Sequence, residues 1–316
     1  MSAAADAGAA PAASTAPAGP SHGRRIFLLW LPAAVVADLL IWFVWGPHLP
    51  PGVMSSAAAN QQSDIKVMSV MAAPVMAFVL IYFGYALIVW RQREGDTEDG
   101  PALHGNTRAQ ASWITITTVI VLSLFVFGTA ELIGSNGAGA GEGPSPIWKP
   151  GGNALQVQVI GQQWRFTYRY PQFGGFETTQ LVLPEGQWVE FHVTSLDVIH
   201  SFWSYQLGVK ADANPGVDNV AYTRPEQAGS FIVRCAELCG LWHGAVFNSG
   251  KVVSMSAFQS WAAATRTQLA AVTKILPPYA TTYDPTVVPT INKAMAKSGI
   301  GGANGYYYPP QDPVQP

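Results

Sequence analysis

The sequence predicts an α-helical membrane anchor of three spans followed by an extracytoplasmic all-β domain. Apolar residues make up 49% of the chain and charged residues only 11%, which is unlike a typical soluble protein. Three long apolar runs lie in the first half, and from residue 154 onward apolar and polar residues alternate in short segments. The formal net charge is −2 and the Lys and Arg residues are scattered, so nucleic acid is not an expected partner.

The membrane anchor is predicted from the length of the apolar runs and the placement of arginines. Residues 1–25 are rich in Ala, Pro, Gly and Ser and are predicted to form a disordered tail. Residues 26–45, 67–90 and 113–133 are each long enough to cross ~30 Å of lipid hydrocarbon as a helix. Arginines precede the first run and lie between the second and third, so we expect these segments in the cytoplasm and the β domain outside.

The first apolar run allows a second interpretation. It is compatible with a signal peptide cleaved near SSAAAN at residues 55–60, although its apolar stretch is longer than such peptides usually have. Asp38 lies within this run. A carboxylate in a membrane span is either a functional group paired with a neighbouring subunit or a protonated group without a role.

The outer part of the chain begins with a Gly- and Pro-rich segment. Residues 134–150 are predicted to be a flexible linker. Residues 151–256 contain short Val-, Phe- and Tyr-rich segments separated by Gly or Pro, which is typical of a small β-sandwich or barrel. Residues 257–275 have helical spacing, with Ser256 as the expected cap. Residues 276–316 form a Pro- and Tyr-rich tail that either lies over another surface or is disordered.

The string CAELCGLWH carries the metal chemistry of the chain. It places Cys235, Cys239 and His243 at intervals of four directly after the predicted strand SFIVR. Thiolates with imidazole suit copper or zinc. A disulfide, a zinc site without the usual ligand spacing, and a single-copper site with an idle second cysteine all stay open on these residues alone.

Four motifs resemble subunit II of the cytochrome c oxidases of the haem-copper family. They are CAELCGLWH, DVIHSFW at residues 197–203, LGVKADANPGVDN at 207–219 and IGQQWRFTYRYP at 160–171. They occur in the order found in that family, and the resemblance covers about residues 64–256. The resemblance implies a cupredoxin-like sandwich and a role in the respiratory electron-transport chain.

The resemblance also implies a ligand set. By this resemblance, Cys235 and Cys239 of this chain would be the thiolates that bridge both coppers of a binuclear CuA centre. His200 would bind one copper, and His243 would bind the other together with the backbone carbonyl of Glu237. The side chain of Glu237 would point toward a magnesium ion at the interface with subunit I.

The function implied by this resemblance is electron transfer within an oxidase. Trp164 would receive electrons from cytochrome c or a small copper protein, and haem in subunit I would then receive them, reduce oxygen and drive proton pumping. The expected partners are subunit I and other oxidase subunits, in the plasma membrane of a prokaryote. The alternatives are a CuA subunit of a nitric oxide reductase and a membrane-anchored copper-binding or assembly protein.

Three features depart from the family pattern. Val246 stands where the family has a weakly coordinating axial methionine, and Met255 is expected to lie too far along the next strand to replace it. The stretch RAQASW before the last span, with Gln110, lacks the glutamate that serves a proton channel in many members. The additional first span is the third difference. Loss of a weak axial ligand is expected to tune the copper potential more than to abolish binding.

Other polar residues are given no place in the metal centre. His192 shares a strand face with Glu190 and is predicted to be a solvated histidine. Asp197, Lys210 and Asp212 match family positions near the subunit I interface. They are expected to make polar contacts there or to lie in solvated turns.

Overall fold

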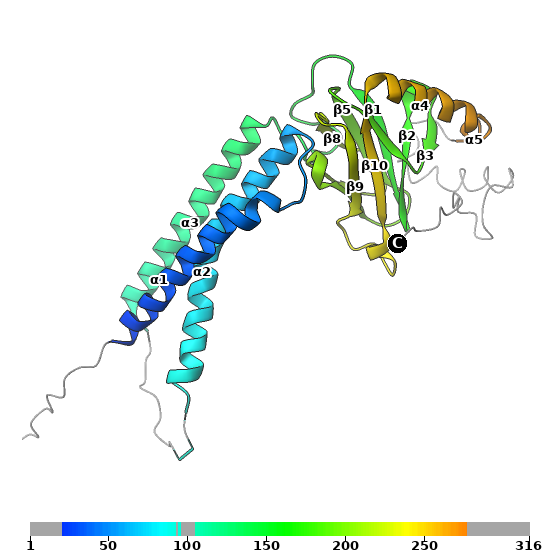
Figure 1. Ribbon diagram of the computed structural model, residues 1–316. Helices are drawn as coiled ribbons and strands as arrows, with labels where there is room; N and C mark the ends of the chain where they lie inside the picture. The colour runs from blue at the N-terminus through cyan, green and yellow to red at the C-terminus, as the bar shows by residue number, and fades with distance from the viewer. Residues whose placement is uncertain (1–20, 93, 96–104, 277–316) are drawn as a thin grey trace, which may run out of the picture. The chain divides into compact units, whose positions relative to one another are not determined.

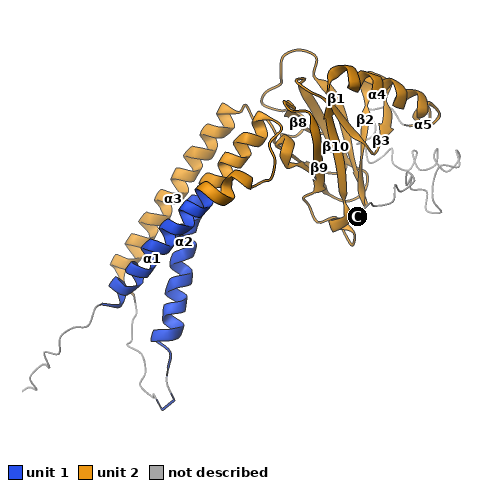
Figure 2. Cartoon of the chain, viewed as in Figure 1, with its two compact units in different colours: residues 1–42, 69–104 blue, residues 43–68, 105–316 orange. Residues whose placement is uncertain are grey.

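The computed structural model describes residues 21–92, 94–95 and 105–276. Two compact units are distinguished, residues 1–42 with 69–104 and residues 43–68 with 105–316 (Figure 2). Most of the predicted N-terminal tail and all but residue 276 of the predicted C-terminal tail lie outside the described residues. Residues 22–25, which were expected in the N-terminal tail, belong to the first helix.

Three helices in the described part of the chain are long and apolar enough to cross a membrane (Figure 1). They are α1 His22–Leu40, α2 Ser56–Val89 and α3 Thr107–Gly134, and α1 continues through shorter turns to His48. α2 begins well before the predicted residue 67, because polar turns precede its apolar part. These turns and the residue before them contact the β domain: Ser55 Oγ donates to the carbonyl of Leu207 and Gln61 Nε2 donates to that of Gly208, both at 2.8 Å.

Ten strands in the described residues form a two-layered β domain. One sheet has the order β3-β2-β1-β5-β8 and the other β4-β10-β9-β6-β7. The predicted fold class, a three-span anchor followed by an all-β domain, is thereby confirmed. The strands are β1 Leu155–Gln162, β2 Arg165–Tyr170, β3 Phe176–Thr178, β4 Leu181–Pro184, β5 Val189–Ser195, β6 His200–Ser204, β7 Val209–Ala213, β8 Asn219–Thr223, β9 Gly229–Cys235 and β10 Phe247–Val253.

The core between the sheets is aromatic. Phe202 of β6 contacts the rings of Phe166, Tyr168 and Phe191 from the opposite sheet, at centroid distances of 5.9, 6.4 and 5.1 Å. All four side chains are fully buried. Burial of each such ring stabilises the fold by about 2–3 kcal/mol, so this cluster holds the two sheets together next to the strand that begins at His200.

The helix after the last strand starts earlier than the sequence predicts. α4 spans Met255–Gln268 and is followed by a short α5, Ala270–Thr273. The prediction that Ser256 caps it is wrong: Ser254 has an extended backbone, and its hydroxyl accepts a hydrogen bond from the N–H of Ala257 at 3.3 Å. Met255 is therefore the first residue of a helix and does not lie on a strand.

Part of the predicted flexible linker is docked on the sandwich. The N–H of Gly139 donates to the carbonyl of Tyr222 on β8, and the carbonyl of Gly139 accepts from the N–H of Lys210 on β7, both at 2.8 Å. A β-carbon at Gly139, whose φ is +90°, would collide with the carbonyl oxygen of Gly208. The glycine therefore serves a close backbone approach rather than flexibility alone.

Candidate metal centre

Neighbouring strands bring the predicted ligands together at one end of the sandwich. His200 is the first residue of β6 and Cys235 the last of β9, and these strands pair in antiparallel fashion. Cys239 and His243 lie on the loop between β9 and β10, which we call the ligand loop, residues 236–246. His200 and both cysteines are buried.

The side-chain donors form one compact group. The Sγ atoms of Cys235 and Cys239 are 3.8 Å apart, and both cysteines are free thiols. Nδ1 of His200 lies 3.9 Å from Cys235 Sγ, and Nδ1 of His243 lies 3.5 Å from Cys239 Sγ. Among the described residues, His200, Cys235 and Cys239 form a group whose ligand atoms all lie within 4.8 Å of one another. Each sulfur thus has its own imidazole.

The protonation of the two thiols shows why a cation suits this place. Burial raises the pKa of Cys235, but hydrogen bonds from His200 and from the backbone outweigh it and lower the pKa to about 6. Burial and the charge of Cys235 raise the pKa of Cys239 to about 12. Two thiolates so close repel each other unless positive charge lies between them. A soft metal ion supplies that charge, so the donor set fits copper.

Asp197 orients His200, a role that the sequence prediction did not assign to it. Its Oδ1 accepts a hydrogen bond from Nε2 of His200 at 2.8 Å, which leaves Nδ1 directed at Cys235. Burial lowers the pKa of His200, but the hydrogen bonds to Asp197 and Cys235 raise it to about 9. Gly161 of β1 makes room for the ring, because a β-carbon there would lie 3.0 Å from it.

The remaining predicted positions of the ligand loop lie as follows. The carbonyl oxygen of Glu237 is 3.1 Å from Cys235 Sγ, and the side chain of Glu237 is exposed. Val246 is buried in the core, and its carbonyl accepts a hydrogen bond from the N–H of Cys235 at 3.2 Å. Its side chain has no atom that can bind a metal, so the loop contributes only main-chain structure at this position.

Trp164 lies against the ligand loop and is only partly exposed. A β-carbon at Gly240 would be 3.4 Å from its Nε1. Gln163, for which the sequence predicts no role, donates from Nε2 to the carbonyl of Cys239 at 2.9 Å. The only available signal was its position beside Trp164 in IGQQWRF.

His192 differs from its prediction as a solvated histidine. Its side chain is 13% exposed; Nδ1 lies 2.8 Å from Oδ2 of Asp218, and Nε2 lies 3.4 Å from Oε1 of Glu190. The prediction is wrong because Asp218, from the turn before β8, lies against the His192 ring and covers it from solvent. Of the other predicted polar positions, Lys210 lies over the ring of Trp203 at 5.3 Å, and the side chain of Asp212 is exposed.

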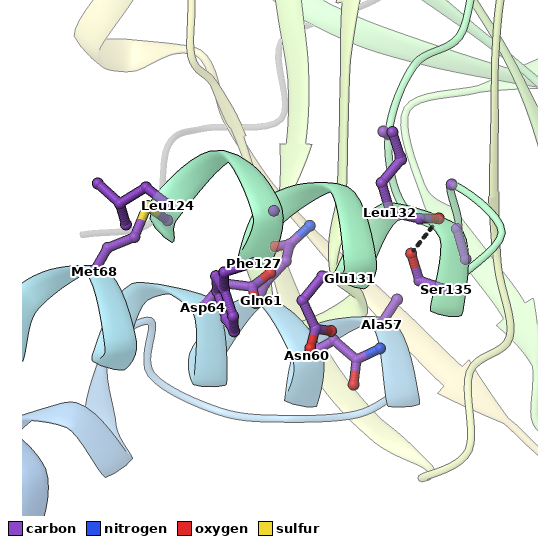
Figure 3. Close-up of a pocket in the computed structure, with 14 residues that line it drawn as sticks. Ala57, Asn60, Gln61, Asp64, Met68, Leu124, Phe127, Glu131, Leu132 and Ser135 are labelled. Carbon is purple, nitrogen blue, oxygen red and sulfur yellow. Dashed lines mark hydrogen bonds between the residues drawn. The ribbon is translucent and has the colours of Figure 1, made fainter. Parts of the chain in front are cut away.

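A pocket of about 320 Å³ lies between α2 and α3 within the second unit (Figure 3). Its polar lining includes Asn60, Gln61 and Asp64 of α2 and Glu131 of α3. The residues described as lining it include no His or Cys. The pocket therefore offers oxygen donors and differs in kind from the thiolate and imidazole group.

Comparison with known proteins shows the family of this chain. The family model for the periplasmic domain of cytochrome c oxidase subunit II matches residues 177–249. Cytochrome c oxidase subunit 2 of Bacillus subtilis is 30% identical over 254 residues, which cover 76% of this chain and 67% of the relative. The chain belongs to the cytochrome c oxidase subunit II family.

Two other members of this family are also similar to the chain. Subunit 2 of Synechocystis sp. is 28% identical over 73% of this chain and 80% of its own. The solved periplasmic domain of subunit II of cytochrome oxidase from Bradyrhizobium japonicum is 30% identical, covers 37% of this chain and 97% of its own, and has a TM-score of 0.36.

Family membership confirms the predicted function. The chain is the subunit through which electrons enter a haem-copper oxidase, and it works as part of that oxidoreductase complex. It is a membrane protein with helical spans and a periplasmic-type domain. Within it, the group of His200, Cys235 and Cys239 fits a copper site.

Proposed function

We propose that the chain holds a binuclear CuA centre in which Cys235 and Cys239 bridge two coppers. His200 would bind one copper, and His243 and the carbonyl of Glu237 the other. The observation that carries this proposal is the 3.8 Å separation of the sulfurs, with one imidazole Nδ1 beside each. A single-copper site of the blue type uses one thiolate, so a second buried sulfur with its own imidazole supports a pair.

The chemistry of the site is outer-sphere electron transfer. When bound, a copper pair sharing two thiolates takes up one electron over both metals, which keeps reorganisation small between the donor and the haem of subunit I. The protein contributes three buried donors, His200, Cys235 and Cys239, and the partly exposed His243. Asp197 holds the His200 ring in the ligating orientation, and the exposed loop leaves the site open to partners.

Electrons are proposed to enter at Trp164, from cytochrome c or a small copper protein. Leu241 and Trp242, which follow Gly240 on the ligand loop, are 84% and 57% exposed. Both are uncharged, so docking near Trp164 should rest mainly on apolar contact. Turnover should then change little with ionic strength, and a steep fall with added salt would contradict this part of the proposal.

The exposed carboxylate of Glu237 is proposed to help bind magnesium at the interface with subunit I. Magnesium prefers oxygen ligands such as carboxylates. The side chain of Glu237 is exposed, whereas the two cysteines are buried. The arginines that flank the spans support a β domain on the outer side of the membrane, which we propose to be the plasma membrane of a prokaryote.

The proposal is tested by loading the full chain, in detergent, with copper and recording absorption and EPR spectra. The expected result is a mixed-valence signal from one electron shared by two copper nuclei. His192→Gln is the matched control and should keep this signal, because His192 lies outside the donor group. A colourless protein without free thiols, or a signal from one copper nucleus only, would contradict the binuclear centre.

A further inference from the structure

Gln163, next to Trp164 in the chain, links this segment to the ligand loop and to the strand that carries His200. Its side-chain Nε2 donates to the carbonyl oxygen of Cys239 at 2.9 Å. Its backbone N–H donates to Oδ2 of Asp197 at 2.6 Å, and Oδ1 of the same carboxylate accepts from Nε2 of His200 at 2.8 Å. One residue is therefore bound to the ligand loop by its side chain and, through Asp197, to the strand of His200 by its main chain.

The indole of Trp164 has no hydrogen bond of its own to fix it. Its Nε1 is buried and has no hydrogen-bond partner in the described part of the chain. It lies beside Gly240, where a β-carbon would be 3.4 Å from Nε1 of Trp164 and 2.9 Å from Nε2 of Gln163. The φ of Gly240 is +113°, which other residues rarely adopt. The place of the ring is therefore set by packing on Gly240 and by the hydrogen bonds of the preceding residue.

We propose that Gln163 is a positioning residue for electron transfer, which holds the Trp164 indole against the main chain of Cys239 and Gly240. This inference rests on the proposed function, in which Trp164 receives the electron. The donor is oxidised by one electron and the copper centre is reduced by one. No bond forms or breaks, and no proton passes through Gln163. Because electron transfer weakens steeply with distance, a small displacement of the indole should slow it without changing the copper ligands.

Two variants separate positioning from metal binding. Gln163→Met keeps the length of the side chain and removes the donor, while Gln163→Glu keeps its shape and turns the donor into an acceptor facing the Cys239 carbonyl. Gln172→Met is the matched control: Gln172 also bridges backbone groups, accepting from the N–H of Gln156 at 3.0 Å and donating to the carbonyl of Ala154 at 2.9 Å. It does so outside the ligand loop.

The experiment uses the copper-loaded full chain labelled with 5-fluorotryptophan. The fluorine resonance of Trp164 is identified by its loss in Trp164→Phe, and its paramagnetic shift reports how near the indole is to the copper. We expect this shift to fall in both Gln163 variants, with reduction by cytochrome c about tenfold slower. The mixed-valence EPR signal should stay, and Gln172→Met should match the unaltered chain.

Two results would overturn the proposal. One is an unaltered Trp164 resonance and reduction rate in both Gln163 variants. The other is loss of the mixed-valence signal in both, because Gln163 would then hold the ligand loop together instead of positioning the indole. Failure of the proposed function is seen separately, as a missing mixed-valence signal or no reduction by cytochrome c in the unaltered chain.

Discussion

Two histidine–carboxylate pairs lie in the β domain, one on each sheet, and only one belongs to the candidate metal centre. His200 and His192 each have a carboxylate oxygen 2.8 Å from a ring nitrogen, and hydrogen bonds raise the pKa of each to about 9 against the effect of burial. The difference lies at the other ring nitrogen. That of His200 faces Cys235 Sγ at 3.9 Å, whereas that of His192 faces Glu190 at 3.4 Å.

This comparison shows which surroundings suit a histidine to metal binding. A carboxylate partner fixes the ring and increases its basicity in both places. The soft sulfur beside His200 makes that site suited to copper, while the second carboxylate beside His192 makes that site an ion-pair cluster. We therefore expect changes around His200 to act on copper and changes around His192 to act on folding stability.

The largest effect is expected from removing one of the sulfurs. Cys239→Ser should abolish the mixed-valence copper signal, because a hydroxyl does not replace a bridging thiolate. EPR of the copper-loaded chain measures this. Ser201→Ala, at a buried position next to His200, is the control and should keep the signal. A mixed-valence signal that persists in Cys239→Ser would show that the two sulfurs do not act as a pair.

The next effect concerns the two carboxylates. Asp197→Ala should weaken copper binding by about 10–100-fold, the usual result of losing the partner of a metal-bound histidine. Asp218→Ala removes the matching carboxylate of His192 and should leave copper affinity unchanged. Competition with a copper chelator measures both affinities. Equal affinities in the two variants would remove the distinction between the two pairs.

His192 should make stability depend on pH. Its pKa of about 9 is above the ordinary value of 6.5, so its stabilisation is complete below pH 6.5 and is lost as pH rises through 9. Asp218 and Glu190 face the ring, and Tyr222 and Lys149 interact in turn with Glu190. We expect the free energy of unfolding to fall by about 3 kcal/mol over this range.

Denaturant unfolding of the copper-loaded chain between pH 6.5 and 9.5 checks this expectation. In the copper-loaded chain, His200 as the proposed ligand would be held by copper and would not titrate in the same range. His192→Gln should have a flatter dependence on pH than the unaltered chain. The same slope in both proteins would show that the Asp218 and Glu190 cluster does not stabilise the fold through this proton.

The smallest effect is expected at the position without an axial ligand. Val246→Met should shift the absorption maximum and reduction potential of the copper centre while changing copper affinity less than Asp197→Ala, because the thiolates and imidazoles remain. Val246 is 2% exposed, so the larger side chain costs about 1–3 kcal/mol of stability. Val252→Met, equally buried on β10, controls for this cost and should leave the spectrum unchanged. Identical spectra for both variants would show that residue 246 does not face the copper.

Much of the fold could be predicted from local patterns. Apolar runs of sufficient length indicated α1, α2 and α3, and alternation indicated strands, because both signals depend on near neighbours in the chain. The start of α4 was placed too late because Ser254 and Ser256 are both good caps, and only backbone conformation at Ser254 decides between them. The sequence predicts flexibility at the linker glycine Gly139 because its hydrogen-bond partners, Tyr222 and Lys210, are remote in sequence.

The sequence by itself determined which donors this protein has: two thiols and a histidine four residues apart, a second histidine in DVIHSFW, and no thioether at residue 246. Only the tertiary structure decided how they are used. The pairing of β6 with β9 brings His200 to Cys235, and the fold places Asp197 on His200, Asp218 on His192 and Gln163 on Cys239. The physical reason is that these contacts join residues from different strands and loops, and a hydrogen bond or a metal ligand depends on position in space.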